Sequence, residues 1–133
     1  MITTLQARSM LDAGQAKAAA MGVPVNLVLL DQGAHLKAFV RMDGAVLGSI
    51  DIAIRKARTS VLFEAASEAV WEYCKPGAPA HGLEHSNGGL APFAGGIPLK
   101  GKHGETLGAI GVSGGAVPQD LEIAQAAVAA FDP

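Results

Sequence analysis

Arg41 and Asp43 lie two residues apart at the end of a strand-like segment, Phe39 to Ala45 (FVRMDGA). Alternate residues of a strand point to the same face, so these two side chains are expected to lie together. One interpretation is a surface ion pair that closes a turn and contributes about 0–1 kcal/mol. The other is a binding site, in which the planar guanidinium of Arg41 holds a carboxylate and Asp43 acts as a general base or hydrogen-bond acceptor. In either case, Gly44 lets the backbone turn away from an open strand end.

Lys56 lies on a helix that is predicted to follow this strand end, with Ser49 as its N-cap. Its position is near the edge of the apolar face of that helix, so we expect its side chain to be half-buried. A half-buried lysine beside the strand-end aspartate Asp43 is either a structural ion pair or a clamp for a substrate. The sequence leaves both alternatives open.

Glycines flank a run of polar side chains in the segment Gly82 to Gly89 (GLEHSNGG). An exposed loop that carries Glu84, His85 and Asn87, with glycines that let the backbone approach closely, is typical of a pocket wall. His85 is either a general acid or base near neutral pH, a ligand to iron, or a solvated loop histidine.

The same loop contains the pattern His-x-x-Glu-His, which one class of zinc protease carries on a helix. Pro79 and Gly82 lie beside and inside the pattern and disfavour a helix. We therefore predict no metal site. The other two histidines, His35 and His103, are expected to be ordinary surface residues, and the single cysteine, Cys74, a reduced structural thiol.

Two glycine-containing pairs could present backbone N–H groups to an anion. They are Gly95 with Gly96, and Ser113 with Gly114. Neither pair belongs to a phosphate-binding loop or a dinucleotide fingerprint, because the required spacing is absent. The alternative is that these glycines serve tight packing and turns.

The elements that must position these residues follow from the periodicity of apolar residues and from turn signals. Strands are paired as hairpins rather than through crossover helices, which predicts an α+β domain with an antiparallel sheet flanked by helices on both sides. A loop over about 75–94 is unusually long and is therefore expected to be functional. The predicted helices cover about residues 4–21, 50–63, 64–73 and 118–131, and the predicted strands about residues 25–30, 34–40, 95–99 and 106–112.

Composition narrows the function classes. The 133 residues are expected to form a single domain, 1–133, and the charged fraction of only 17% favours self-association into a homo-oligomer. A net charge of −2 without any basic run disfavours nucleic acid as a partner.

No apolar stretch approaches the ~20 residues of a membrane span, and the N-terminus lacks the pattern of a signal peptide. With one cysteine, a cytoplasmic location is the simplest expectation.

Three separated segments resemble the GlcG/HbpS family, also called the haem-degrading or DUF336 domain. They are DQGAHLKAFVRMDGA (31–45), IAIRKARTS (52–60), and GGIPLK with GETLGAIGVSGG (95–100 and 104–115). The resemblance covers nearly the whole chain in the right order. It implies an α-β-α, profilin-like domain that assembles into homo-oligomers with small-molecule pockets near subunit contacts. Members are associated with haem, with corrinoid enzymes and with catabolic operons.

Three functions remain open from the sequence. The first is a small-molecule-binding oligomer whose ligand is haem or a related tetrapyrrole, which the resemblance favours. The second is a cofactor-free isomerase, lyase or hydratase for a small carboxylated or hydroxylated substrate, in which Arg41 binds the carboxylate and Asp43 or His85 moves the proton. The third is an accessory oligomer that assists a neighbouring catabolic enzyme.

Overall fold

A computed structural model describes all 133 residues. The first helix, α1 (Thr4–Met21), begins at Thr3, whose side chain accepts a hydrogen bond from the Gln6 N–H at 3.1 Å. The Gln6 side chain accepts one in return from the Thr3 N–H at 2.9 Å, which completes a capping box. Gly22 ends the helix in the left-handed region, at φ 68°. The predicted boundaries of this helix are therefore confirmed.

Four antiparallel strands form one sheet in the order β2-β1-β4-β3. The central strand β1 is buried on both faces, as its unbroken apolar run predicts, and side chains of alternating residues enter different layers. Leu27 and Leu29 pack toward one layer, and Val28 and Leu30 pack toward the other. The strands are β1 (Asn26–Asp31), β2 (Leu36–Arg41), β3 (Gly96–Lys100) and β4 (Thr106–Ser113).

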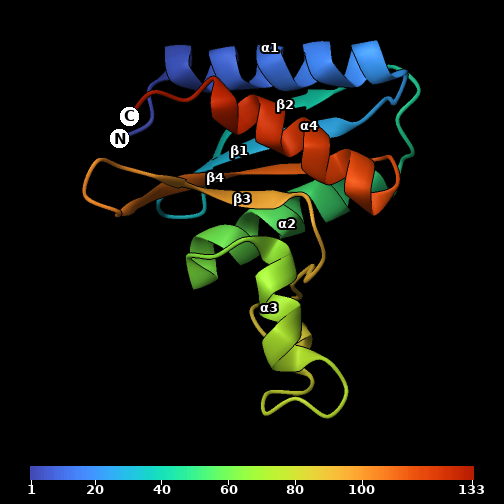
Figure 1. Cartoon of the computed structure of the whole chain (residues 1–133), viewed down its shortest axis with the longest axis vertical. Helices are drawn as coiled ribbons and strands as arrows, with labels where there is room; N and C mark the ends of the chain where they lie inside the picture. Colours follow the sequence, from blue (N-terminus) through green and yellow to red (C-terminus); the bar gives the residue numbers. More distant parts are fainter.

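Helices cover both faces of this sheet (Figure 1). One face packs against α1 and α4 (Val117–Ala129), and the other packs against α2 (Ser49–Phe63). The predicted α+β architecture with helices on both sides is confirmed. No helix combines the length and the hydropathy that a membrane crossing requires.

An arm projects from this body and consists of α3 (Ser67–Cys74) and the long segment that follows it (Figure 1). The helix predicted from residue 64 starts three residues later, because Glu64 takes a left-handed conformation, at φ 54°, that ends α2. A 3₁₀ turn, η1 (Leu83–His85), lies within the long segment. Two arginines of α2 tie that segment to the body: Arg55 donates to the Gly88 carbonyl at 2.6 Å, and Arg58 donates to the Asn87 carbonyl at 2.9 Å.

Ser49 was expected to be the N-cap of α2, and this prediction is wrong. Ser49 is the first helical residue, and Gly48 takes the cap position without a side-chain hydrogen bond. The Ser49 hydroxyl donates to the Val46 carbonyl and accepts a hydrogen bond from the Asn26 amide at 2.6 Å. This tertiary hydrogen bond to the buried start of β1 uses the oxygen that would otherwise cap the helix.

Candidate functional site

Arg41 lies at the end of a row that crosses three strands. The strand register places it opposite Asn26, and Asn26 opposite Ser113. Arg41 and Asp43 are exposed, and none of the ion pairs of the chain joins them. Neither residue lines any of the four hollows of the molecule. Within one chain, the strand-end pair therefore faces solvent rather than a pocket.

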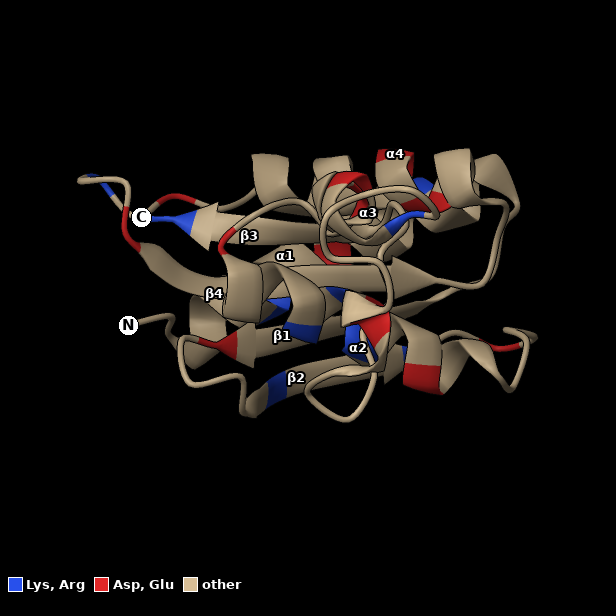
Figure 2. Cartoon of the chain, turned by 90° about the horizontal axis from the view of Figure 1, so that it is seen from below, with Lys and Arg blue, Asp and Glu red and all other residues tan.

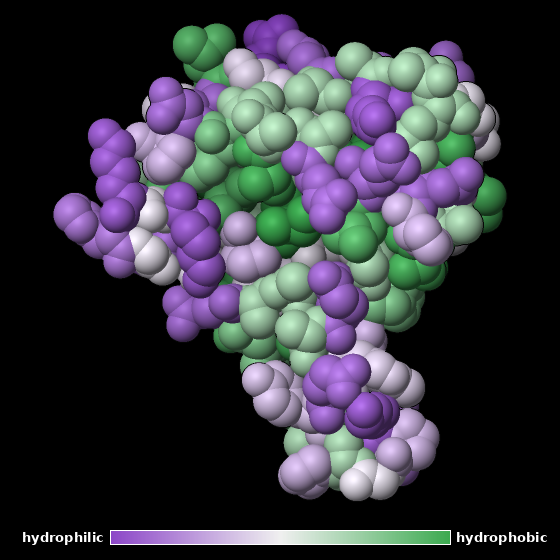
Figure 3. All heavy atoms as spheres, in the orientation of Figure 1, coloured by the Kyte–Doolittle hydropathy of each residue, from purple (hydrophilic) through white to green (hydrophobic).

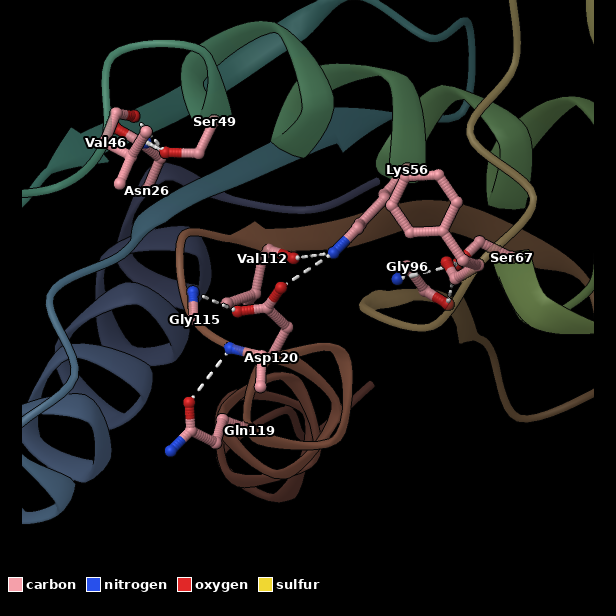
Figure 4. Close-up of polar contacts among 12 residues, drawn as sticks. Asn26, Val46, Ser49, Lys56, Ser67, Gly96, Val112, Gly115, Gln119 and Asp120 are labelled. Carbon is pink, nitrogen blue, oxygen red and sulfur yellow. Dashed lines mark hydrogen bonds and ion pairs between the residues drawn. The ribbon is translucent and has the colours of Figure 1, made fainter.

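Lys56 is fully buried, at 0% exposure, rather than half-buried. Its Nζ donates to Asp120 Oδ2 at 2.9 Å and to the Val112 carbonyl at 2.8 Å (Figure 4). The partner that we expected was Asp43; the structure instead pairs Lys56 with an aspartate of α4. Burial lowers the pKa of the Lys56 ammonium, and the hydrogen bond and charge of Asp120 act in the opposite direction.

This ion pair holds two neighbouring segments in place. Asp120 also accepts a hydrogen bond from the Gly115 N–H at 2.9 Å, which fixes the turn before α4 (Figure 4). On its other side, Lys56 Nζ lies 5.2 Å from the centre of the Phe93 ring. The Phe93 carbonyl in turn accepts a hydrogen bond from the Ser67 hydroxyl at 2.6 Å. Lys56 thus connects α2, β4, α4 and the segment that enters β3.

Gly95 and Gly96 pack against Lys56. A Cβ atom on Gly95 would lie 2.7 Å from Lys56 Nζ, and one on Gly96 would overlap the Lys56 carbonyl. The N–H of Gly96 donates to the Ser67 hydroxyl at 2.9 Å. Gly114 similarly allows close approach, since its Cβ would lie 2.8 Å from the Pro24 carbonyl oxygen. Close packing accounts for these glycines in the structure, and the Gly96 N–H is already used within the chain.

The largest hollow, about 600 Å³, lies where the arm meets the body. We call it the acid–aromatic hollow. Figure 3 shows the arm extending from the body, with apolar surface around its base. Glu84, one of the predicted loop residues, lines this hollow, whereas His85 and Asn87 do not. The lining residues are Glu68, Trp71, Glu72, Glu84, Pro92, Phe93, Ala94 and Val117.

The zinc-protease pattern on the arm does not form an α-helix, because only Leu83–His85 adopt a helical turn and that turn is 3₁₀. No group of three histidine, cysteine or acidic side chains could hold a metal ion. Cys74 is buried beside Glu84, and burial raises the pKa of its thiol.

Two histidines that we expected to be ordinary surface residues line smaller hollows. The His35 hollow, about 390 Å³, also contains Lys37, and the His103 hollow, about 450 Å³, also contains Lys102. Met1 and Leu107 line both, so the two hollows are neighbours at one end of the sheet. The sequence signal that could have indicated these two hollows is a lysine within two residues of each histidine. What the sequence could not provide is the pairing of β1 with β4, which places the two hairpin tips at the same end of the sheet.

Acidic and basic side chains are mixed over most of the molecule. Figure 2 shows acidic and basic residues interspersed over the ribbon, with no extended stretch of one sign. The acid–aromatic hollow is the exception, because all of its charged side chains are carboxylates.

Comparison with known proteins identifies the family. The family model described as "Haem degrading protein HbpS-like" matches residues 2–129. The chain belongs to the HbpS-like family. This confirms the resemblance in the sequence. The HbpS-like chain is 36% identical over 131 residues to a 15.0 kDa protein from the dhaT–dhaS intergenic region of Citrobacter freundii, covering 98% of this chain and 92% of that one.

A second relative is larger. The HbpS-like chain is 37% identical over 117 residues to the corrinoid adenosyltransferase PduO of Salmonella typhimurium, which covers 87% of this chain but only 34% of PduO. The chain therefore spans about a third of that enzyme.

Solved structures of the family superpose closely on this HbpS-like protein. Klebsiella pneumoniae ORFY has a TM-score of 0.94 at 33% identity, covering 98% of this chain and 90% of that one. The complex of PduOC with haem has a TM-score of 0.93 at 34% identity, covering 98% and 94%. HbpS itself has a TM-score of 0.90 at 28% identity, covering 98% and 90%.

Proposed function

We propose that this HbpS-like protein binds haem or a related tetrapyrrole as its small-molecule ligand, as a homo-oligomer. The observation that carries the proposal is the similarity to PduOC, whose structure contains haem and which is 34% identical to this chain over 98% of its length. PduO, the corrinoid adenosyltransferase, supports the wider tetrapyrrole class, because corrinoids are related macrocycles.

The end of the molecule that carries the His35 and His103 hollows has the side chains that such a ligand needs. A haem requires an axial ligand, an apolar surface for the macrocycle and a cation for its propionates. Both histidines are exposed, and each hollow contains one lysine, Lys37 or Lys102, to balance its one carboxylate, Asp31 or Glu105. Leu107, which lines both hollows, provides apolar surface. We propose that the imidazole of His35 or His103 would hold the iron of the macrocycle.

The acid–aromatic hollow fits haem less well. It offers two aromatic rings, but Glu68, Glu72 and Glu84 line it without any lysine or arginine. Propionates placed beside three carboxylates would be repelled. His85 lies on the arm that borders this hollow, and it stays a second candidate for the axial ligand.

An acid–base enzyme would need Arg41 and either Asp43 or His85 around one substrate. No hollow of the single chain encloses any of the three. Ligand binding is therefore the function that the geometry supports better.

Titration of the purified protein with haemin is expected to produce a saturable shift of the Soret band. We would compare the single alanine variants of His35, His81, His85 and His103. Either His35→Ala or His103→Ala is expected to weaken binding about tenfold or more, because loss of a coordinate bond costs well over 1.4 kcal/mol. His81→Ala, another exposed loop histidine, is the matched control and is expected to bind as the wild type does. A spectrum that stays that of free haem would overturn the haem proposal. If only His85→Ala lost the shift, His85 on the arm, rather than His35 or His103, would be the residue that binds the iron.

The homo-oligomer is tested by light scattering of the same samples. Several large apolar side chains are exposed on one chain, among them Leu47 at 73% and Val46 at 65%, and we expect other copies to cover them. The measured mass is expected to be a multiple of 13.5 kDa. Leu47→Glu is expected to shift the population toward smaller species, because it places a charge in the proposed contact. A mass of one chain at micromolar concentration would contradict this part of the proposal.

A further inference from the structure

We propose that the acid–aromatic hollow is a second binding site and that its ligand is a small organic cation, an ammonium or guanidinium attached to an apolar group. This site is distinct from the one proposed for haem, and it does not depend on haem binding.

The charge of the hollow favours a cation. Its charged side chains are Glu68, Glu72 and Glu84. Glu72 is paired with Lys75 at 2.7 Å on the exposed side of α3, whereas no ion pair neutralises Glu68 or Glu84. A second ammonium, that of Lys56 behind Phe93, is already paired with Asp120.

Two carboxylate oxygens at the hollow lack hydrogen-bond partners. Oε2 of Glu68 and Oε1 of Glu84 are buried and have no donor within the chain. Buried polar atoms in folded proteins are almost always hydrogen-bonded, and a carboxylate is especially costly to leave unpaired. Glu68 comes from α3 and Glu84 from η1, and both residues line the hollow, so the negative charge of two carboxylates from different elements acts on a cation bound there.

The rest of the wall suits the organic part of such a ligand. Trp71 and Phe93 are each 40% exposed, and the faces of aromatic rings attract ammonium and guanidinium groups. Pro92, Ala94 and Val117 add apolar surface for a hydrocarbon substituent. A volume of about 600 Å³ is within the range of small-molecule sites. A bare metal ion suits the hollow poorly, since no three acidic, histidine or cysteine side chains converge there.

The chain contains one tryptophan, Trp71, which lines this hollow and therefore reports on it directly by fluorescence. We would titrate the intact oligomer with three probes that share a phenyl ring and differ in charge: phenethylammonium, 2-phenylethanol and phenylacetate. Phenethylammonium is expected to change Trp71 fluorescence saturably, with affinity about tenfold or more above that of the neutral alcohol, because charge-assisted hydrogen bonds and the aromatic faces act only on the cation. Phenylacetate is expected to bind most weakly.

Substitutions of the glutamates test which carboxylates bind the cation. Glu68→Gln and Glu84→Gln keep the size of the side chain and remove its charge, and each is expected to reduce the affinity for phenethylammonium several-fold. Glu122→Gln is the matched control, because Glu122 pairs with Lys17 between α1 and α4, away from the arm. Equal affinity for 2-phenylethanol and phenethylammonium in the wild type would overturn the proposal, even if a variant fails to fold. Unchanged affinity in a folded Glu68→Gln/Glu84→Gln double variant would also overturn it. Because the fluorescence titration contains no haem, failure of the haem proposal leaves this result unaffected.

Discussion

Replacing Lys56 by methionine is expected to lower the free energy of unfolding by about 3–5 kcal/mol, because removal of one member of a buried ion pair leaves the other charge uncompensated. Asp120 is only 2% exposed, and without Lys56 its remaining partner through the side chain is the Gly115 N–H. Denaturant unfolding of the wild type and the variant at the same protein concentration measures the change.

The chain offers a matched control for this substitution. Lys17 pairs with Glu122 at 3.2 Å, but both side chains are exposed, at 40% and 54%. Lys17→Met is therefore expected to cost no more than about 1 kcal/mol. The double variant Lys56→Met/Asp120→Leu is expected to recover a large part of the loss, because it removes both buried charges. If Lys56→Met were no more destabilising than Lys17→Met, the buried pair would not have the role assigned to it here.

Replacing Gly111 by alanine is expected to destabilise the protein by about 1–3 kcal/mol or more, since α2 lies too close to β4 for an added methyl group. A Cβ on Gly111 would overlap the Ala53 carbonyl and would lie 2.9 Å from the Cβ of Ala57, both in α2. The register places Gly96 directly opposite Gly111, and a Cβ on Gly96 would overlap the Lys56 carbonyl. The two glycines thus make a flat area of the sheet on which α2 rests, and thermal and denaturant unfolding of Gly111→Ala measure its importance.

Gly48 is the matched control for a glycine-to-alanine change. Its backbone conformation, at φ −61° and ψ −21°, is accessible to any residue, and a Cβ there would meet nothing within 4 Å. Gly48→Ala is therefore expected to be neutral or to stabilise the protein slightly, by up to about 1 kcal/mol, through the unfolded state. Equal unfolding midpoints for the Gly111→Ala variant and the wild type would contradict the close-packing argument.

Local patterns were sufficient to predict most elements of this fold. Thr3 and Gly22 mark the two ends of α1, and the apolar run before Asp31 identifies a strand buried on both faces. These signals act between residues a few positions apart, so they can be read along the chain. Where the prediction shifted, at Ser49 and at the start of α3, a tertiary hydrogen bond or a left-handed residue decided the boundary.

The candidate sites were much less predictable. Arg41 and Asp43 are at a strand end, as expected, but whether a strand end opens into a pocket depends on which elements pack beside it. Lys56 was expected beside Asp43, and it pairs with Asp120, which is 64 positions away in the sequence. The hollows of His35 and His103 are neighbours because the antiparallel pairing of β1 with β4 places both hairpin tips at the same end of the sheet.

By itself, the sequence determined the family, the order of helices and strands, and the two-sided burial of the central strand, because motifs and periodicity depend on neighbouring residues. Only the tertiary structure decided the partner of Lys56, the glycine contact beneath α2 and the composition of each hollow. Those features depend on how α2 and α4 pack against the sheet and on where the arm meets the body. This packing brings together residues that are far apart in the sequence.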